Sequence, residues 1–520
     1  MNITPLSLNC NGSLKSDSHP NQQVNLTPNN ISNNKNYYSN NYYLNPLAFK
    51  ATHAEIISKM QKIAEKDKSS AELKVLFNQM SDTVRNNINA VMEKFKPYGL
   101  SLEAYLPICA RHPQRFYQTA NTMDKNVNGV IDKLKDYGLT RENYIPACIK
   151  APSIFFQSPE TIEKNVKSVV ERYKDNGLTL EKYIPACLET ATLFYQAPET
   201  IIQNVDTVIE AFKNSGLTAD KYISACLKHP NLFQRDPETI IKNVIYMTQR
   251  FEKEGLTIPN YISGCLESPS NFCESPYTLE KNVTDIVERF KGNGLKLEEY
   301  IHTCIKQPQL FHLTADTVEK NVMGVVDKFK DYGLTTEQYL HACLKQPPLF
   351  TQSPDRIESN VKTVAENFKN KGLLLEKYIQ ACVKKSSIFS QSPDTVKEHI
   401  NIMRFSKLNT GKEIDSDSFW NKLLSHPIEL TYSTGLILTE NLLIPKMFEN
   451  STIPNELKRH HLKENLADYL KNNSDNKYVF EVRELDSNAG CIKLLQDYLD
   501  KLTKDLNLKK DTFRLSVIKD

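Results

Sequence analysis

The sequence predicts an all-α protein, an α-solenoid of eight 39-residue repeats, each made of a short helix, a turn and a long helix, with a small C-terminal α/β appendage. The first observation is a Gly-Leu pair that recurs at one spacing, for example 138 − 99 = 39. Tyrosine, cysteine and phenylalanine keep the same register, from Tyr105 to Tyr378, Cys109 to Cys382 and Phe116 to Phe389. A fixed period of 20–50 residues is typical of stacked repeats, in which each unit buries its apolar face against the next. The glycines are Gly99, Gly138, Gly177, Gly216, Gly255, Gly294, Gly333 and Gly372.

The first half of each unit predicts a short amphipathic helix, here described for the second unit, residues 139–177. Thr140 is a good N-cap residue. Tyr144, Ile145 and Cys148 then form one apolar face. Pro146 lies within this segment, and we expect it to kink or shorten the helix.

The second half predicts a tight connector and a longer helix. Phe155 follows Pro152 in the connector, and Ser158-Pro159 has the pattern of an N-cap followed by the first helical residue. An apolar stripe then runs along the helix at Ile162, Val166, Val169, Val170 and Tyr173. Gly177 supplies a left-handed C-cap.

The ends of the chain differ from the repeats at 100–411. Residues 1–50 are rich in Asn and Ser and predict a disordered tail. Residues 51–99 predict a helical cap, with Ile56, Ile57, Met60 and Ile63 on one face, followed by half a repeat. Residues 412–454 predict a degenerate capping repeat, in which Phe419, Leu423, Pro427 and Leu430 keep the spacing. Residues 455–520 predict the α/β appendage, with helices at 457–470 and 491–506 and strands at 478–482 and 513–518.

The repeat resembles that of the mitochondrial transcription termination factor (mTERF) family. The matching residues are Gly138-Leu139-Thr140, Pro152-Ser153-Ile154-Phe155 and Ser158-Pro159-Glu160, and the resemblance covers roughly residues 80–410. It implies a curved helical solenoid that commonly binds nucleic acid and has no catalytic residues. The long helix is about one turn longer than the family's, the basic excess is weak, and no Arg-rich presequence is expected.

Bulk properties exclude several other classes. The formal net charge is only +3, which counts mildly against a dedicated nucleic-acid binder. No apolar run has the length of a transmembrane helix, and no secretory signal is expected. We find no catalytic motif, no metal-ligand spacing and no cofactor fingerprint, so we expect neither an enzyme nor a small-molecule substrate. A cytoplasmic monomer is the expectation.

Two conserved-looking columns of the repeat have structural explanations. The repeat cysteines predict small buried core residues, because no CxxC pair suggests zinc and free thiols fit a reducing compartment. An asparagine that recurs from Asn126 to Asn360 predicts a ladder of hydrogen bonds to the connector of the next unit, although a polar reader of a ligand is the alternative.

A row of basic residues, two positions after the repeat cysteine, is the first candidate for binding. Its regular spacing fits contacts with phosphates, and Lys385 reinforces it. Glu189 and Glu267 interrupt it, and a favourable interaction with the C-terminal helix dipole explains it without a ligand. The row comprises Arg111, Lys150, Lys228, Lys306, Lys345 and Lys384.

Two columns of variable residues are the second candidate, because core positions do not tolerate such a range of size and polarity. They either face a ligand or are unconstrained solvent-exposed sites. The candidates are Tyr117, Phe156, Tyr195, Gln234, His302, His312 and His341. The sequence thus favours a non-enzymatic binding scaffold, with a protein partner slightly ahead of an mTERF-like nucleic-acid ligand.

Overall fold

The computed structural model describes residues 53–65, 70–458, 462–485 and 490–518. The tail predicted at residues 1–50, with its Cys10, lies outside the described residues. The described part of the chain begins with α1 (His53–Glu65), α2 (Ser70–Asn78) and α3 (Asp82–Phe95). Ile56, Ile57 and Met60 of α1 are buried as expected. The helix α3 occupies the place of a long repeat helix and leads into Gly99, whose φ is 92°.

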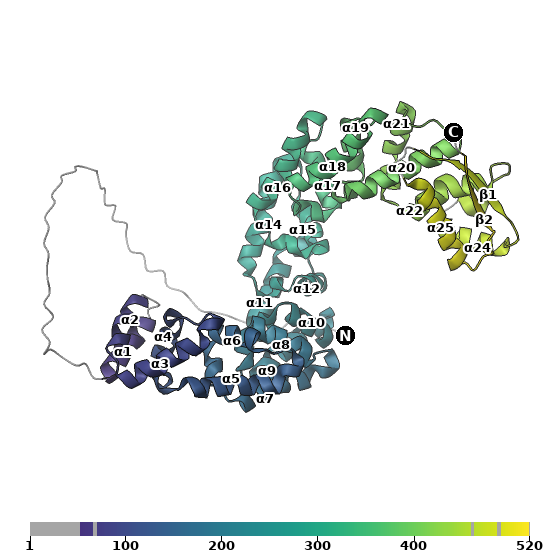
Figure 1. Cartoon of the computed structure of the whole chain (residues 1–520). Coiled ribbons are helices and arrows are strands. Elements are labelled where there is room, and N and C mark those ends of the chain that lie inside the picture. Colours follow the sequence, from purple (N-terminus) through teal and green to yellow (C-terminus); the bar gives the residue numbers. More distant parts are fainter. Residues whose placement is uncertain (1–52, 66–69, 459–461, 486–489, 519–520) are drawn as a thin grey trace, which may run out of the picture. The chain divides into compact units, whose positions relative to one another are not determined.

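The eight predicted repeats are confirmed, and Figure 1 shows them as a succession of paired helices. The short helices are α4 (Leu102–Arg111), α6 (Arg141–Lys150), α8 (Leu180–Glu189), α10 (Ala219–Lys228), α12 (Ile258–Glu267), α15 (Leu297–Lys306), α17 (Thr336–Lys345) and α19 (Leu375–Lys384). The long helices are α5 (Ala120–Leu134), α7 (Pro159–Tyr173), α9 (Pro198–Phe212), α11 (Pro237–Arg250), α14 (Pro276–Phe290), α16 (Ala315–Phe329), α18 (Pro354–Phe368) and α20 (Pro393–Asn409). One 3₁₀ turn or, in the fifth unit, the short helix α13 (Ser270–Cys273) connects the two helices of each unit.

The helices form two layers, because long helices pack on long helices and short helices on short ones. Contacts join α5 to α7, α7 to α9 and so on to α20, and likewise α6 to α8 and on to α19. The stripe residues Ile162, Val166 and Val169 are buried in this seam. Each long helix from α5 to α18 is followed by a 3₁₀ turn and a glycine such as Gly177, which adopts the left-handed conformation (φ 82°) that other residues avoid.

Aromatic pairs hold consecutive units together. Tyr144 of the second unit meets Phe194 in the connector of the third, with ring centroids 5.3 Å apart and an interplanar angle of 80°. Equivalent edge-to-face pairs recur in the following units, up to Tyr339 and Phe389. Such pairs contribute about 0.5–1.5 kcal/mol beyond their buried area. The repeated tyrosine and phenylalanine are therefore core residues of the joint between units.

The expected shortening of the helix by Pro146 is wrong. The helix α6, which contains Pro146, and α10, which has no proline, are both ten residues long. A proline removes only the hydrogen bond to the carbonyl four residues earlier, here that of the exposed Glu142. Burial of Tyr144 and Cys148 on the opposite face holds the helix across that gap.

The degenerate ninth unit follows the predicted spacing. The helix α21 (Asp417–Ser425) takes the place of a short helix, and a 3₁₀ turn over Pro427–Thr431 takes that of a connector. The helix α22 (Thr434–Leu438) then continues through a π-helical turn over Thr439–Leu443 into α23 (Ile444–Met447). Phe419, Leu423 and Leu430 are buried.

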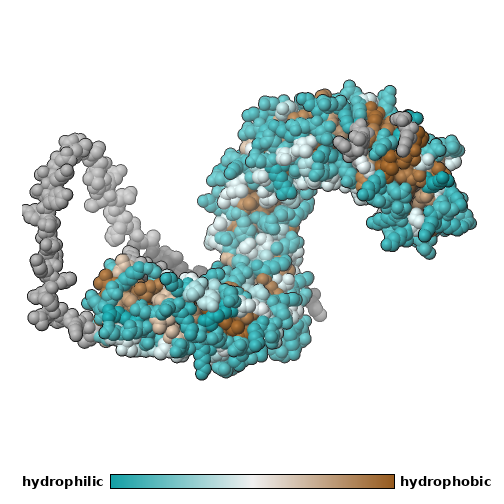
Figure 2. All heavy atoms as spheres, viewed as in Figure 1, coloured by the Kyte–Doolittle hydropathy of each residue, from teal (hydrophilic) through white to brown (hydrophobic). Residues whose placement is uncertain are grey.

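The C-terminal appendage is also confirmed. It comprises a 3₁₀ turn over Asn455–Lys458, α24 (Leu462–Asn472), β1 (Tyr478–Arg483), α25 (Cys491–Asp505) and β2 (Phe513–Ile518). The two strands pair in parallel, with Tyr478 opposite Phe513 and Arg483 opposite Ile518. Figure 2 shows hydrophilic residues over most of the repeats and a hydrophobic area over the C-terminal part of the chain.

Candidate functional site

The predicted basic row lies at the C-terminal ends of the short helices. Arg111, Lys150, Lys228, Lys306, Lys345 and Lys384 are each the last residue of their helix, and all six are exposed. The carbonyl groups that end each helix favour a cation there. Lys385 is the C-cap residue of α19 and is half-buried. Glu189 and Glu267 take the same place in α8 and α12, and both are exposed.

The cations of the long helices behave differently, because most of them are paired. Those near the helix ends bind the acid three residues earlier, as Lys174 does with Glu171 (2.5 Å). Others join consecutive units, as Lys133 does with Glu163 (2.6 Å) and Arg250 with Glu280 (2.5 Å). Further pairs of these two kinds include Lys135–Asp132, Lys213–Glu210, Lys291–Glu288, Lys330–Asp327, Arg172–Asp206, Arg289–Glu319 and Lys328–Glu358.

The lysines of the row have no such partner within the described residues. Lys150, Lys228, Lys306, Lys345 and Lys384 form no ion pair there. Arg111 is different, since its guanidinium donates to the carbonyl of Ala64 at the end of α1 (3.2 Å). Five ammonium groups at equivalent places therefore keep their donors directed to solvent.

Five of the seven asparagines in the column form the predicted ladder, and Asn165 and Asn204 do not make this bond. Asn126 Nδ2 donates to the carbonyl of Phe155 in the next connector (3.2 Å), and Asn321 donates to that of Phe350 (2.9 Å). Asn243, Asn282 and Asn360 make the same bond. In the eighth unit His399 of α20 replaces the asparagine, and its Nδ1 lies 2.8 Å from the carbonyl oxygen of Leu430 in the ninth unit. The amide groups of the ladder are engaged in hydrogen bonds to backbone carbonyls. The basic row is therefore the better candidate for binding a ligand.

The first variable column lies against the glycine turn that leads into the preceding unit. A Cβ atom added to Gly255 would lie 3.1 Å from His302 Nε2, and Gln380 Nε2 donates to the carbonyl of Gly333 (3.2 Å). In the ninth unit Trp420 fills the corresponding place and donates from Nε1 to the carbonyl of Lys371 (2.6 Å). His302 and His341 are nevertheless exposed.

The second variable column lies in the connectors. Tyr117 is 57% exposed, whereas Tyr195 is half-buried. The guanidinium of Arg115 stacks over the ring of Phe156 at 4.2 Å. Arg115 itself is only 9% exposed, so it holds the ring of Phe156 and is not part of the exposed surface. The sequence does not single it out, because the equivalent residues of the other units are aliphatic or, in the fifth unit, Asn271.

Polar members of this column bind the preceding connector. Thr192 Oγ1 donates to Gln234 Oε1 (2.6 Å). His312 Nε2 lies 3.1 Å from Ser270 Oγ, and burial lowers the pKa of His312. The column therefore contributes to the joints between units as well as to the surface.

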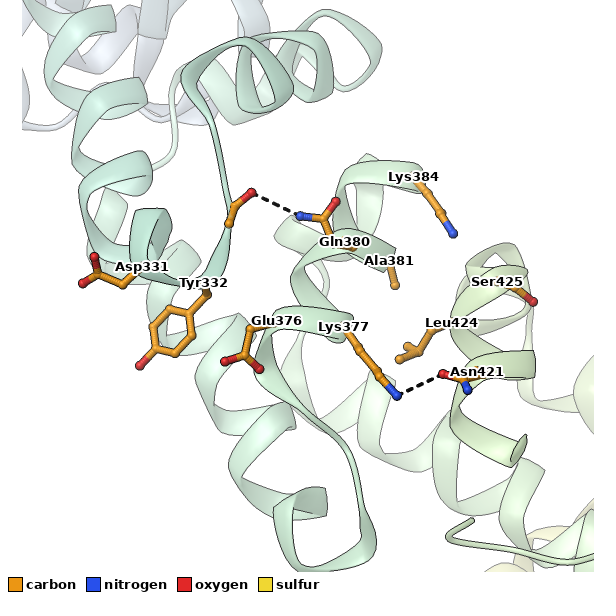
Figure 3. Close-up of a pocket in the computed structure, with 11 residues that line it drawn as sticks. Asp331, Tyr332, Glu376, Lys377, Gln380, Ala381, Lys384, Asn421, Leu424 and Ser425 are labelled. Carbon is orange, nitrogen blue, oxygen red and sulfur yellow. Dashed lines mark hydrogen bonds between the residues drawn. The ribbon is translucent and has the colours of Figure 1, made fainter. Parts of the chain in front are cut away.

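The row ends at a groove between α19 and α21, shown in Figure 3. The groove has a volume of about 530 Å³, and Lys377 and Lys384 both line it. They lie seven residues apart on α19, two helical turns, and so share one face. Lys377 Nζ donates to Asn421 Oδ1 (3.1 Å), while Asp331 and Glu376, which also line the groove, add negative charge. An equivalent groove of about 400 Å³, lined by His341, lies one unit earlier.

Lys377 is a further residue of this surface that the sequence reasoning misses. Its column, the residue before the repeat tyrosine, contains Lys182 and Lys221, which donate to the carbonyls of Gly177 and Gly216 (2.9 and 3.3 Å). The 39-residue register was the signal that marks this column. Lys377 differs because the ninth unit places Asn421 and Asp417 beside it.

The repeat cysteines lie in the core, as predicted. All eight, from Cys109 to Cys382, are free and fully buried. Burial raises the pKa of Cys109 to about 12 and raises those of Cys226 and Cys265 well above the ordinary value. Within the part of the chain that the structure describes, no three His, Cys, Asp or Glu side chains gather to hold a metal ion. Among the same residues, no helix combines the length and apolar character needed to span a membrane.

We therefore expect the repeat thiols to react slowly with a maleimide or disulfide reagent in the native protein. The reagent needs both access and a thiolate, and the raised pKa values keep the thiols protonated at neutral pH. Unfolding in denaturant restores an ordinary pKa and is expected to speed labelling by orders of magnitude. The half-buried Cys273 is an internal comparison with partial access. Rapid native modification of Cys226 or Cys265, located by mass spectrometry, would contradict the core assignment.

Stacked pairs of helices with an exposed basic row along one edge define an α-helical repeat scaffold. A model of the mTERF family matches residues 46–270, from the N-terminal cap into the fifth unit, and the later units keep the same register. The chain is an mTERF-like helical-repeat protein. Members of this family generally bind nucleic acids and are not typically enzymes. No curated protein matches this sequence.

Proposed function

We propose that this protein is a non-catalytic scaffold that binds nucleic acid, with the basic row contacting phosphates. The observation that carries the proposal is the difference between the two sets of cations. Most cations of the long helices are in ion pairs, with Lys125, Lys164, Lys281 and Lys320 among the exceptions, whereas every lysine of the row is exposed and unpaired in the described part of the chain: Lys150, Lys228, Lys306, Lys345 and Lys384. This reverses the slight preference for a protein partner that composition alone gives.

Unpaired cations matter because phosphate binding is driven largely by the release of counterions from the nucleic acid. A lysine that already neutralises a carboxylate gains little from a phosphate, while one that faces solvent gains the full contact. The helix dipole stabilises the charge of each row lysine without using its outward N–H donors. A low net charge of +3 is compatible with binding when the unpaired charge is concentrated along one edge.

Lys385 and the variable residues extend the proposed surface. Tyr117, Phe156 and Tyr195 belong to the first three units and offer partly exposed rings. Such rings stack on bases in proteins that bind single strands. His302, His341, Gln234 and His312 offer polar edges in the later units.

A protein partner is the second candidate, and a different surface favours it. Tyr277 on α14 is 67% exposed and stacks beside Tyr246 of α11, with ring centroids 4.8 Å apart. Ile245, which lies on α11 beside Tyr246, is 37% exposed. Exposed tyrosines that are held in place are frequent in protein interfaces. We place the protein in a reducing compartment such as the cytoplasm, where its free buried thiols are stable.

The proposal is tested by measuring the affinity of the full chain for a duplex DNA, a duplex RNA and a single-stranded RNA of equal length over a range of salt concentrations. Five to six phosphate contacts predict that log K falls linearly with log salt, with a slope of about −4 to −5. Fluorescence anisotropy at ~50–200 mM salt covers the range in which that slope is measurable.

The same titration can contradict the proposal. If none of the three probes binds at low salt, or if binding occurs without salt dependence, the row does not contact phosphates. Pull-down with a variant in which Tyr277 and Ile245 are changed to serine then tests the protein-binding surface.

A further inference from the structure

The C-terminal sheet is open along one edge. The described sheet contains only β1 and β2. The outer edge of β1 is closed at Arg483. Its N–H donates to Oδ1 of the buried Asn409 (2.6 Å), and its C=O accepts from Nδ2 of the same residue (3.0 Å). Within the described residues, no backbone group bonds to the outer edge of β2.

The direction of the backbone groups on β2 follows from its pairing. Tyr478 N–H donates to the carbonyl of Thr512 (2.8 Å), so residues 512, 514 and 516 direct their backbone groups toward β1. Phe513, Leu515 and Val517 alternate with them and therefore direct theirs outward. Each leaves one N–H and one C=O for a further strand.

The apolar side chains on the inner face of the sheet are also less buried at the open edge of β2 than on β1. Phe480 and Val482 of β1 are buried, with exposed fractions of 1% and 0%. Their partners on β2 are less covered: Leu515 is half-buried and Val517 is 44% exposed. Proteins usually protect open edges with proline, bulges or several charges, and between residues 513 and 518 the only such device is Arg514.

We propose that β2 pairs with β2 of a second copy of this chain, antiparallel and centred on Leu515, to form a four-stranded sheet. A two-fold axis perpendicular to the sheet keeps both inner apolar faces on one side, whereas a parallel pairing of the two edges would place them on opposite sides. With Leu515 on the axis, Phe513 pairs with the partner's Val517, and the outward-facing groups of the two strands meet each other.

The side chains are complementary in this register. On the inner face, one row of side chains across the four strands is formed by Phe480 and Leu515 of one copy and Leu515 and Phe480 of the other. In the adjacent row, Phe513 of one copy lies against the exposed Val517 of the other. On the outer face Arg514 lies opposite Ser516, and Glu481 lies beside that serine on β1. Strands are about 4.8 Å apart, so the guanidinium reaches across the small serine toward this carboxylate.

Neighbouring registers are poorer. A pairing centred on Arg514 places two guanidinium groups opposite each other, and like charges directly opposite are destabilising. A pairing centred on Ser516 takes Phe513 out of contact with Val517. The dimer replaces the monomer that the sequence leads us to expect, and it is independent of nucleic-acid binding.

The test is the mass of the full chain as a function of concentration, by sedimentation and light scattering. We expect a reversible shift toward twice 59.6 kDa in the micromolar range, because strand pairing buries less area than a permanent dimer needs. Val517→Lys adds a charge opposite Phe513 and is expected to raise the dissociation constant at least tenfold. Circular dichroism and Trp420 fluorescence check that this variant is folded.

A cysteine pair tests the register itself. Leu515→Cys brings two thiols to directly opposed positions, about 5.5 Å apart between Cα atoms, which a disulfide spans. This variant is expected to form a covalent dimer under mild oxidation much faster than the wild type or Val479→Cys, whose site on β1 is 57% exposed but far from the axis. A chain that stays monomeric at about 50 µM overturns the proposal, as do equal cross-linking rates at 515 and 479 or a dimer that Val517→Lys leaves intact.

Discussion

Replacing Lys306, Lys345 and Lys384 together with glutamate is expected to weaken nucleic-acid binding by about 10²–10³-fold at ~100 mM salt. The three residues end α15, α17 and α19 in adjacent units, and no glutamate interrupts them. The change removes three unpaired ammonium groups and places carboxylates where phosphates would lie. The magnitude of the slope of log K against log salt should fall by about three, which anisotropy titrations measure directly.

The matched control changes Lys174, Lys213 and Lys291 to glutamate. These residues are also exposed and alter the net charge by the same amount, but each already forms an ion pair with the acid three residues earlier. We expect a loss of affinity of a few-fold at most. Equal losses in both triple variants would mean that total charge, and not the row, governs binding.

Completing the row offers a test in the opposite direction. Glu189 and Glu267 end α8 and α12 at the two interrupted places and are exposed. Changing both to lysine gives every unit a cation and suits the dipole at the helix end. Affinity should rise and the salt slope should steepen by about two. An unchanged slope would show that the ligand does not pass these units.

Removing the carboxylate of Asp415 is expected to destabilise the ninth unit by about 3 kcal/mol or more. Arg404, which is 1% exposed, donates from Nε and Nη2 to the two oxygens of Asp415, both at 2.6 Å. Asp415 itself adopts a left-handed conformation (φ 62°), and its carbonyl packs against Gly372 in the turn that leads into the eighth unit. Asp415→Ala therefore leaves a buried guanidinium without its bidentate acceptor.

The fluorescence of Trp420, the single tryptophan of the chain, reports on the folding of the ninth unit. Trp420 is fully buried against Phe368 and bonds to the carbonyl of Lys371, so its fluorescence follows the ninth unit while far-UV circular dichroism follows the whole array. In urea, Asp415→Ala should move the tryptophan transition to lower concentration far more than the dichroism transition. Repeat arrays unfold unit by unit, which makes the two probes separable.

Two further variants define the cause. Arg404→Met removes the buried charge together with its need for a partner and should cost less than Asp415→Ala. Asp327→Ala breaks an exposed pair with Lys330 and should change stability by less than about 0.5 kcal/mol. A tryptophan transition that Asp415→Ala leaves in place would show that the pair does not hold the ninth unit.

The sequence by itself determined the repeat, its helices and its core. Tyrosine, cysteine and phenylalanine recur every 39 residues because each has a fixed place in the core between units, and the glycine recurs because the long helices lead into the same left-handed turn. Local signals such as Ser158-Pro159 and Gly177 mark where the helices begin and end. The strands of the appendage were equally visible, because runs such as Tyr478-Val479-Phe480 carry strong β propensity. The basic row was visible as a column of residues.

Only the tertiary structure decided which of these residues are available. Ion pairs such as Lys133–Glu163 join residues 30 positions apart, and no local pattern distinguishes that lysine from the unpaired Lys150. The asparagine ladder, the contact of His302 with Gly255 and the closed and open edges of the sheet also depend on which units become neighbours. Pairing and exposure arise from contacts between units, and the sequence of one unit encodes them only through the stacking that brings the next unit beside it.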